Sequence, residues 1–227
     1  MTSVIAEIVD EVRQGNCILF LGSGSSIACE SPGGGGLTGA GLSQAMVEEL
    51  GEDPANFTAT LQEASEYLEA YLPQHRRALD EFTYRRLHDL RPTIGHLLLT
   101  LFPWKAIITT NYNRAVETGF EVAATRGITA YSCVPLRTDA ELTGYSPRPD
   151  QIPLFKPHGC LSVRNDPNAP MVLTAKDYYS STKKRSEMYS RIRQLAGRFS
   201  TVFAGYSLVD YNFNNIYYEL REYLFTA

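Results

Sequence analysis

The feature that most constrains the fold is a set of short, mostly apolar runs, each followed at once by small or polar residues. Runs of four to six residues without polar alternation are typical of strands buried on both faces of a parallel sheet. The runs lie at residues 17–21, 105–110, 152–156 and 201–204, with residues 131–134 as a weaker fifth candidate. The chain therefore favours a sheet whose strands are covered by helices on both faces.

Helical patterns at residues 114–125 and 211–224 follow two of these runs. Alternation of strands and helices predicts an α/β fold, a Rossmann-like parallel sheet flanked by helices. Residues 38–101 break the alternation with several helical patterns and no clear strand. We expect this block to be a helical insertion between the first and second strands.

Several residues in the chain are candidates for helix starts. Thr38 or Ser43, and then Thr58, are candidate N-caps within the insertion, and Pro92 is placed near the first position of a later helix. Further along, Thr174 is expected to cap a helix that carries Tyr178 and Tyr179, both expected to serve in packing.

The first 15 residues form an amphipathic helical pattern. Its acidic residues exclude a signal peptide, and no apolar run approaches the roughly 18–20 residues of a membrane span. Its apolar face carries Val4, Ile5, Ile8, Val9 and Val12. The sequence ends at residues 224–227 inside a helical pattern without a cap, glycine or proline signal. We therefore expect the chain to be the N-terminal part of a longer protein.

Charge and cysteine spacing narrow the classes of function. The formal net charge is −4, which argues against a dominant nucleic-acid surface because such surfaces need clustered Lys and Arg. The basic run at residues 183–185 is expected to be a solvated helix face. The four cysteines, at positions 17, 29, 133 and 160, include no C-x-x-C pair. We expect no zinc ribbon, no metal site and a reducing, cytoplasmic location.

The first polar cluster is a glycine-rich turn directly after the first strand. Backbone N–H groups at such a turn, together with the start of a helix, suit a phosphate. The alternative is a purely structural turn, since Ile27 stands where a third Rossmann glycine is usual. The turn consists of Gly22, Ser23, Gly24 and Ser25. The glycine run at residues 33–36 that follows is either a flexible loop or a mobile lid.

The second and third clusters follow the next strands. Thr110, Asn111 and Asn113 stand where open α/β sheets bind ligands, and a neutral amide suits a ribose hydroxyl or a water. The alternative is that Asn111 caps the helix that begins near Arg114. His158 follows another strand, and histidine, with an ordinary pKa of about 6.5, can act as a base at neutral pH.

The remaining histidines and the fourth cluster complete the set. His75, His88 and His96 fall in the helical block, where we expect surface or core roles. The fourth cluster follows the last strand and consists of Gly205, Ser207 and Asp210. Asp210 either caps the next helix or holds a ribose hydroxyl.

In this order the clusters Gly-Ser-Gly-Ser-Ser, Thr-Thr-Asn-Tyr-Asn, Lys-Pro-His-Gly, Leu-Thr-x-x-Asp-Tyr and Gly-Tyr-Ser-Leu-x-Asp resemble the sirtuin-like domains of bacterial anti-phage defence proteins. The resemblance covers residues 15–220. It implies an NAD-binding domain without a zinc ribbon, with NAD as its substrate. The ordered set carries the resemblance, since each cluster alone is common.

The resemblance also implies roles for the cluster residues. Gly22, Ser23, Gly24 and Ser25 would cradle the pyrophosphate of NAD. Asn111, with Thr110 and Asn113 beside it, would position the nicotinamide ribose and the attacking water. His158 would be the general base, acting on a ribose hydroxyl or on that water. Gly205, Ser207 and Asp210 would lie along the adenosine half.

The activity implied is NAD hydrolysis to nicotinamide and ADP-ribose, linear or cyclic, as the effector of a defence system that depletes NAD. Such an effector implies a homo-oligomer or an activating partner, without direct nucleic-acid or membrane binding. Two departures from the family pattern stand out. Asn113 occupies a position where Asp is frequent, and the Pro-Asp-Phe-Arg stretch of true sirtuins is replaced by the glycine run.

Three alternatives remain open at this point. The first is a non-catalytic sensor of NAD or ADP-ribose, which the neutral Asn113 favours. The second is a protein deacylase, which the absence of close cysteine pairs disfavours. The third is an NAD(P)-dependent dehydrogenase, for which the acidic residue expected about 20 positions beyond the turn would be Glu48 or Glu49, both in a helical pattern.

Overall fold

The computed structural model describes residues 4–31, 34–207, 214 and 218 of the chain. Its centre is a five-stranded sheet in the order β5-β6-β4-β1-β7, with every pair parallel. The strands are β1 (Cys17–Leu21), β4 (Ala106–Thr109), β5 (Ser132–Leu136), β6 (Gln151–Phe155) and β7 (Ser200–Ala204). All five strands expected from the sequence are confirmed, and with them the Rossmann-like α/β fold.

The apolar runs form strands here because both faces of the sheet are covered. All residues of β1 and β4 are buried, and successive side chains point to opposite faces. Ile18 and Phe20 pack on one face with Ile192 of a covering helix. Leu19 packs on the other face with Phe120.

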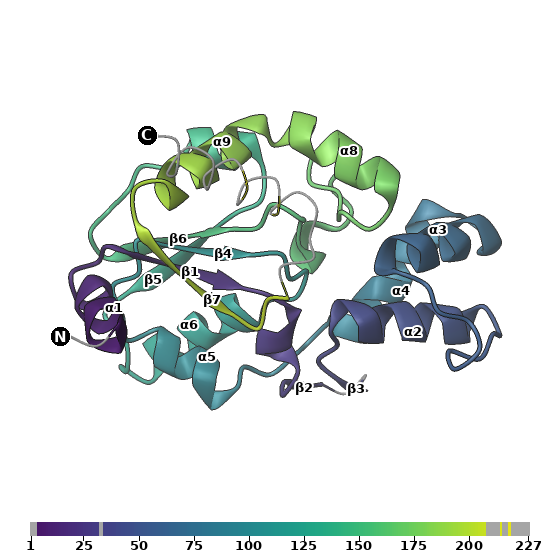
Figure 1. Cartoon of the computed structure of the whole chain (residues 1–227), viewed down its shortest axis with the longest axis horizontal. Coiled ribbons are helices and arrows are strands. Elements are labelled where there is room, and N and C mark those ends of the chain that lie inside the picture. The colour runs from purple at the N-terminus through teal and green to yellow at the C-terminus, as the bar shows by residue number, and fades with distance from the viewer. Residues whose placement is uncertain (1–3, 32–33, 208–213, 215–217, 219–227) are drawn as a thin grey trace.

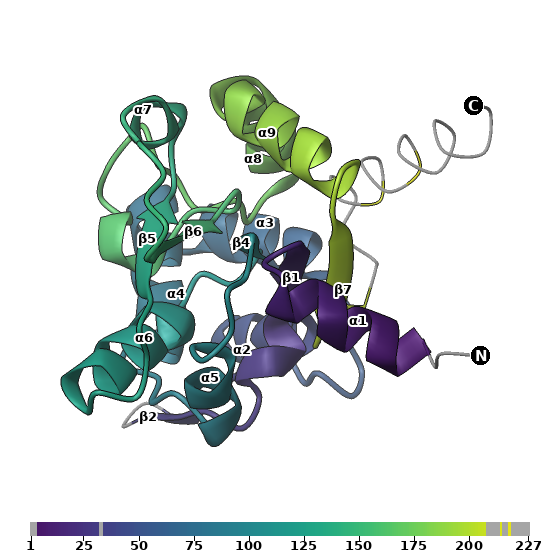
Figure 2. The same ribbon diagram turned by 90° about the vertical axis from the view of Figure 1, so that its left-hand side faces the viewer.

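Helices cover the two faces in separate layers (Figures 1 and 2). On one side lie α7 (Asp139–Thr143), α8 (Ala175–Lys184) and α9 (Ser186–Ala196). On the other side lie α5 (Ile94–Leu99) and α6 (Ala115–Thr125), which pack against each other. The short helix α1 (Val4–Arg13) contacts β1, and η1 (Ser23–Ser26) and η2 (Leu161–Val163) are single 3₁₀ turns.

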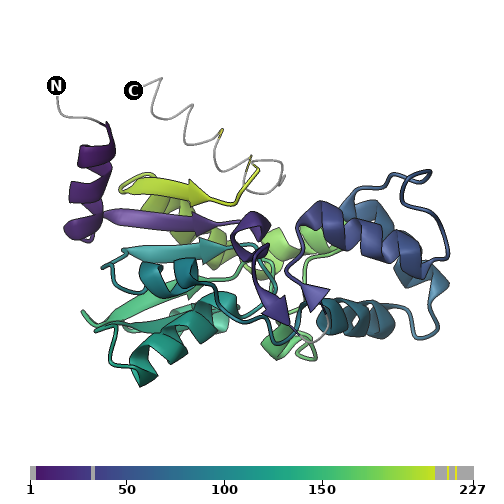
Figure 3. The same ribbon diagram turned by 90° about the horizontal axis from the view of Figure 1, so that it is seen from below.

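The expected helical insertion between the first two sheet strands is confirmed. Its helices α2 (Gly39–Glu49), α3 (Leu61–Tyr71) and α4 (Arg76–Leu87) form a lobe beside the carboxyl ends of the sheet strands (Figure 3). A small hairpin, β2 (Glu30–Ser31) with β3 (Gly34–Gly35), precedes the lobe. The last helix of the predicted block, α5, instead joins the layer on the sheet, because it packs against α6.

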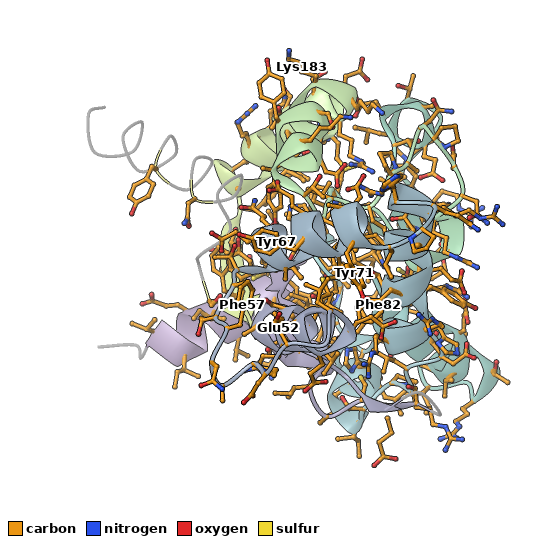
Figure 4. All side chains as sticks on the ribbon, turned by 90° about the vertical axis from the view of Figure 1, so that its right-hand side faces the viewer. Glu52, Phe57, Tyr67, Tyr71, Phe82 and Lys183 are labelled. Carbon is orange, nitrogen blue, oxygen red and sulfur yellow. The ribbon has the colours of Figure 1, made fainter. Side chains whose placement is uncertain are left out.

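The lobe has its own apolar core and an aromatic outer surface. Leu68 and Phe82 lie in the core. Phe57, Tyr67 and Tyr71 are exposed on the outside (Figure 4), with the rings of Phe57 and Tyr67 5.8 Å apart.

Two of the predicted helix starts in the insertion need correction. Thr60, rather than Thr58, caps α3, because its side chain and Glu63 form a reciprocal capping box. Pro92 lies outside α5, whose cap is Thr93. Thr38 caps α2 as one of the two alternatives expected.

The prediction of a solvated basic face at residues 183–185 is wrong for Arg185. Lys183 and Lys184 are exposed, whereas Arg185 is fully buried. Its Nε donates to the Arg137 carbonyl at 2.9 Å and its Nη2 to the Pro170 carbonyl at 2.7 Å. Burial lowers the pKa of Arg185. A guanidinium can serve several carbonyls at once, so this side chain joins loops rather than facing solvent.

The predicted amphipathic helix is present as α1, but most of its apolar face is not covered by the described residues. Val4 is 70% exposed and Ile5 74% exposed, whereas Val12 is buried. The predicted helix at residues 211–224 lies outside the described residues. No described helix is long and apolar enough to cross a membrane.

The glycine run offers a test of local packing. A Cβ on Gly36 would lie 1.7 Å from the carbonyl oxygen of Ser26, whereas a Cβ on Gly35 would make only an ordinary contact, 3.5 Å from Cys29. We expect Gly36→Ala to lower the free energy of unfolding by about 1–3 kcal/mol, because overpacking forces the backbone to shift. Gly35→Ala is the matched control and should change it by less than about 0.5 kcal/mol. Urea denaturation of both variants measures the difference, and equal losses would contradict this account of the turn.

Candidate functional site

The first and fourth polar clusters meet at the carboxyl edge of the sheet, which faces the lobe (Figure 3). The Gly22 N–H donates to the Ala204 carbonyl at 3.0 Å, and the Gly24 N–H donates to the Gly205 carbonyl at 2.9 Å. A Cβ on Gly22 would lie 2.3 Å from that Gly205 oxygen. The glycines are therefore required by the close approach of the turn after β7, in which Gly205 has φ +63°.

The N–H groups of the predicted phosphate cradle are largely engaged in hydrogen bonds within the protein. The N–H groups of Gly22 and Gly24 are engaged as described, and the Ser25 N–H donates to the Gly22 carbonyl at 3.0 Å. The Ser25 hydroxyl also donates to the Gly22 carbonyl, at 2.7 Å. A phosphate here would therefore be held by Ser23, or by the whole glycine turn once the turn that follows β7 has shifted away.

The second cluster joins the first through the side chain of Asn111, which is buried. Asn111 Nδ2 lies 3.0 Å from the Gly22 carbonyl oxygen. The same nitrogen lies 3.3 Å from Ser25 Oγ and 3.2 Å from Ser26 Oγ. No described residue donates a hydrogen bond to its other amide atom, Oδ1. The amide is thus oriented by the glycine turn and keeps an acceptor for a ligand hydroxyl or a water.

The backbone before Asn111 is fixed from β1. The Asn111 N–H donates to Thr109 Oγ1 at 3.1 Å, and this hydroxyl donates to the Leu21 carbonyl at 2.9 Å. Thr110 lies between them and is half-buried. The neighbouring strands β1 and β4 therefore set the position of Asn111 together.

Asn113, rather than Asn111, bonds to the first turn of α6, whose N-cap residue is Arg114. Its Oδ1 accepts a hydrogen bond from the Ala115 N–H at 3.1 Å, and its Nδ2 donates to Ser26 Oγ at 3.2 Å. The helix-start alternative for Asn111 is wrong, because Asn111 turns toward the glycine turn instead. Both asparagines thus contact the buried hydroxyl of Ser26.

A buried ion pair that is not apparent from the sequence links the second cluster to the third. Lys156 follows β6 and is fully buried, and its Nζ lies 3.0 Å from Glu117 Oε1 on α6. The same ammonium donates to the Asn113 carbonyl. Burial opposes the charged form of Lys156, but Glu117 and Cys160 outweigh it, so that the pKa of Lys156 is raised. The sequence holds one indication of this pair, a lysine at the end of an apolar strand together with a glutamate in the first turn of a helix.

His158 lies two residues beyond this lysine and is also buried. Its ring stands edge-on to that of Tyr178 on α8, with centroids 5.3 Å apart. The following Gly159 has φ +84°, and a Cβ there would lie 2.7 Å from the Pro170 carbonyl. The ring contact shows that Tyr178 serves in packing, as expected, and that the side chain it packs on is the candidate base His158.

The loop of His158 is tied to the loop of Asn111 through Tyr112. The Tyr112 hydroxyl donates to the Val172 carbonyl at 2.6 Å, and the Val172 N–H donates to the His158 carbonyl at 3.0 Å. The Leu161 N–H donates to the Tyr112 carbonyl at 2.9 Å. These bonds hold the two loops side by side.

The lobe holds the helix that carries Tyr178. Arg76 of α4 forms an ion pair with Asp177, and its guanidinium also donates to the Met171 carbonyl at 2.6 Å. Asp177 is the third residue of α8 and forms a capping box with Thr174, which confirms Thr174 as the predicted cap. Burial raises the pKa of Asp177, but Arg76 and the N–H groups of Thr174 and Leu173 outweigh this, so that it is lowered.

The remaining predicted residues lie apart from these contacts or outside the description. Ser207 is exposed beyond β7, and Asp210 lies outside the described residues. His75 and His88 border α4 in the lobe, whereas His96 is buried on α5 with its Nδ1 2.9 Å from Thr93 Oγ1. In the described part of the chain, no three His, Cys, Asp or Glu side chains form a metal-binding group.

The buried pair predicts a distinctive pattern of stability. Lys156→Met leaves the Glu117 carboxylate buried without its cation, so we expect a loss of about 3–5 kcal/mol in the free energy of unfolding. Adding Glu117→Gln removes the uncompensated charge, so the double variant should be more stable than Lys156→Met alone. Denaturant unfolding of the wild type, both single variants and the double variant gives this coupling. Additive losses would show that the two side chains do not depend on each other.

Comparison with known proteins places these elements in a family. A search of curated proteins finds no match. The family model described as a SIR2-like domain matches residues 105–223, more than half of the chain. The matched range includes β4 and β7, with Asn111, His158 and Gly205. The chain therefore belongs to the SIR2-like domain family.

Proposed function

We propose that this domain hydrolyses the nicotinamide–ribose bond of NAD, releasing nicotinamide and ADP-ribose. Membership of the SIR2-like family supports NAD as the ligand. The observation that carries the proposal is the orientation of Asn111, whose Nδ2 is bound by the glycine turn while no described residue donates to its Oδ1. A neutral acceptor held in this way at the carboxyl edge of a parallel sheet suits a ribose hydroxyl or an attacking water.

In the proposed reaction, the oxygen of a water attacks C1′ of the nicotinamide ribose. The bond between C1′ and the pyridinium nitrogen breaks, and its electron pair neutralises the ring, so that nicotinamide leaves uncharged. The water gives up a proton, which the imidazole of His158 accepts. Because the leaving group departs neutral, the protein needs no strong acid. It acts mainly by positioning the ribose and the one attacking water and by excluding other water.

The arrangement of the loops supports this division of roles. Asn111 orients the ribose or the water through its Oδ1, and His158 supplies the base. Tyr112 bridges the two loops, and Lys156 binds the Asn113 carbonyl. Lys156 and Tyr112 are positioning residues in this proposal, because they fix the distance between the loops without contacting substrate.

The remaining contacts of NAD are assigned by proposal alone. Ser23 holds the pyrophosphate together with Ser25, whose hydroxyl must first give up its hydrogen bond to the Gly22 carbonyl. Gly205, Ser207 and Asp210 follow the adenosine half. Because Gly24 donates to the Gly205 carbonyl in this structure, full engagement of the glycine turn requires the turn after β7 to move. NAD binding is therefore coupled to the segment that follows β7.

We further propose, from the resemblance of the motifs, that the domain depletes NAD in the cytoplasm as the effector of an anti-phage system. Such an activity needs control by oligomerisation or by an activating partner. The second candidate is a domain that senses NAD or ADP-ribose without turnover. It is favoured by the neutral Asn113, whose amide is engaged by the Ala115 N–H and by Ser26 Oγ.

The roles of Asn111 and His158 are tested by nicotinamide release from NAD, followed by chromatography. We expect His158→Ala and Asn111→Ala each to lower the rate at least about 100-fold, the usual contribution of a positioned base or of precise orientation. His88→Ala, which alters a half-buried histidine at the end of α4, is the matched control and should keep the wild-type rate.

Thermal unfolding of the same variants checks that the fold survives. Full activity in folded His158→Ala would contradict the assignment of the base. Tight NAD binding without nicotinamide release by the wild type, even in its activated assembly, would favour the sensor.

A further inference from the structure

A cavity of about 900 Å³ lies at the amino edge of the sheet, opposite the candidate site. Its lining includes Gly15 before β1, Lys105 before β4, Tyr131 before β5 and Gln151 at the start of β6. The other walls come from α9 and from the connection between α7 and β6, and α7 and α9 stand on the same side of the sheet in Figure 2. β1 and β6 span five residues each, or about 16 Å. The lining reaches Phe155 along β6 but includes none of Gly22, Asn111 and His158, so this cavity is separate from the candidate site.

The walls are those of a small-molecule site. The indole of Trp104 and the phenol rings of Tyr131 and Tyr145 contribute flat apolar surface. Prolines at 103, 147, 149 and 153 add rigid apolar surface between them. The volume falls within the roughly 300–1,000 Å³ of ligand pockets, and such aromatic walls suit a planar ring.

The charges around the cavity favour an anion. Lys105, Arg148 and Arg191 line it from three separate segments, against one acidic residue, Glu187. Arg148 pairs with Asp150 at 3.4 Å. Lys105 and Arg191 have no carboxylate partner among the described residues.

An unsatisfied polar group gives independent support. Tyr145 lines the cavity, and its hydroxyl is buried without a hydrogen-bond partner in the part of the chain that the structure describes. Buried hydroxyls are nearly always bonded to protein, water or ligand. The hydroxyl of Tyr145 is therefore a polar group that a bound molecule can satisfy once the ring turns toward the cavity.

We propose that this cavity is a second ligand site, for a planar aromatic anion of the size of a nucleoside monophosphate. The ring lies among Trp104, Tyr131 and Tyr145, with a polar edge at the Tyr145 hydroxyl. The anionic group lies at the mouth, beside Arg191 and Lys105. Neither the proposed NAD cleavage nor its residues require this site.

The tryptophan makes the test specific, because Trp104 is the one tryptophan of the chain and lines this cavity. Adenosine 5′-monophosphate is titrated into the whole chain while Trp104 emission is followed, with excitation outside the absorption band of the nucleotide. Adenosine and inorganic phosphate are the two partial probes. We expect saturable quenching by the monophosphate, at about tenfold lower concentration than by adenosine, as for one charge-assisted hydrogen bond. Phosphate alone should leave the emission unchanged.

Variants within the cavity separate binding there from binding elsewhere. Arg191→Ala should remove the advantage of the monophosphate over adenosine, and Tyr145→Phe should weaken both about fivefold. Ser190→Tyr adds a ring at an exposed lining position of α9 and should abolish quenching. Arg126→Ala and Tyr71→Phe change exposed residues outside the cavity and are the matched controls.

The outcomes decide the proposal. Quenching that is lost in Ser190→Tyr and kept in both controls supports the site. Absence of a Trp104 response to the monophosphate, or quenching that persists in Ser190→Tyr, overturns it. Equal affinity for adenosine and its monophosphate overturns the anionic assignment, and the melting temperatures of the variants confirm that each is folded.

Discussion

The ammonium of Lys156 is the contact on which the arrangement of the candidate site depends. It is fully buried at the end of β6, and it binds both the Glu117 carboxylate of α6 and the Asn113 carbonyl beyond β4. Removing a lysine from water is costly unless its donors are satisfied, and here two neighbouring elements satisfy them. The charge therefore fixes the loop of Asn111 relative to the loop of His158, two residues beyond the lysine. In the proposed reaction Lys156 therefore positions the two loops and does not contact the substrate.

Around that pair, the site is shared among elements far apart in the sequence. The glycine turn after β1 orients Asn111, and the turn after β7 packs on that glycine turn. The lobe contributes through Arg76, which binds Asp177 at the start of α8 and so holds the helix whose Tyr178 packs on His158. A change in the position of the lobe or of the turn after β7 would therefore reach the site directly. This offers a physical route by which a partner or an oligomer can control the activity we propose.

The sheet and its loops were predictable from the sequence because buried parallel strands and strand-end polar clusters are local patterns. The insertion was predictable for the same reason, as a block of helical periodicity. The contacts that assemble the site were not predictable, because Lys156 and Glu117 are 39 positions apart and no spacing rule pairs them. Arg185 was predicted to be exposed because a run of basic residues indicates a solvated surface. The loops that enclose its side chain are not apparent from the sequence. The roles given to Asn111 and His158 remain predictions, supported by where their loops lie.

The central claim is that NAD binds at the carboxyl edge of the sheet, with its reacting carbon between Asn111 and His158. The most direct measurement is a crystal structure of folded His158→Ala grown with intact NAD, since removal of the proposed base should preserve the substrate. The account predicts C1′ of the nicotinamide ribose beside Asn111 Oδ1, the pyrophosphate at Ser23, and the turn after β7 displaced from Gly24. NAD bound only at another place, with the carboxyl edge beside Asn111 empty, would contradict it.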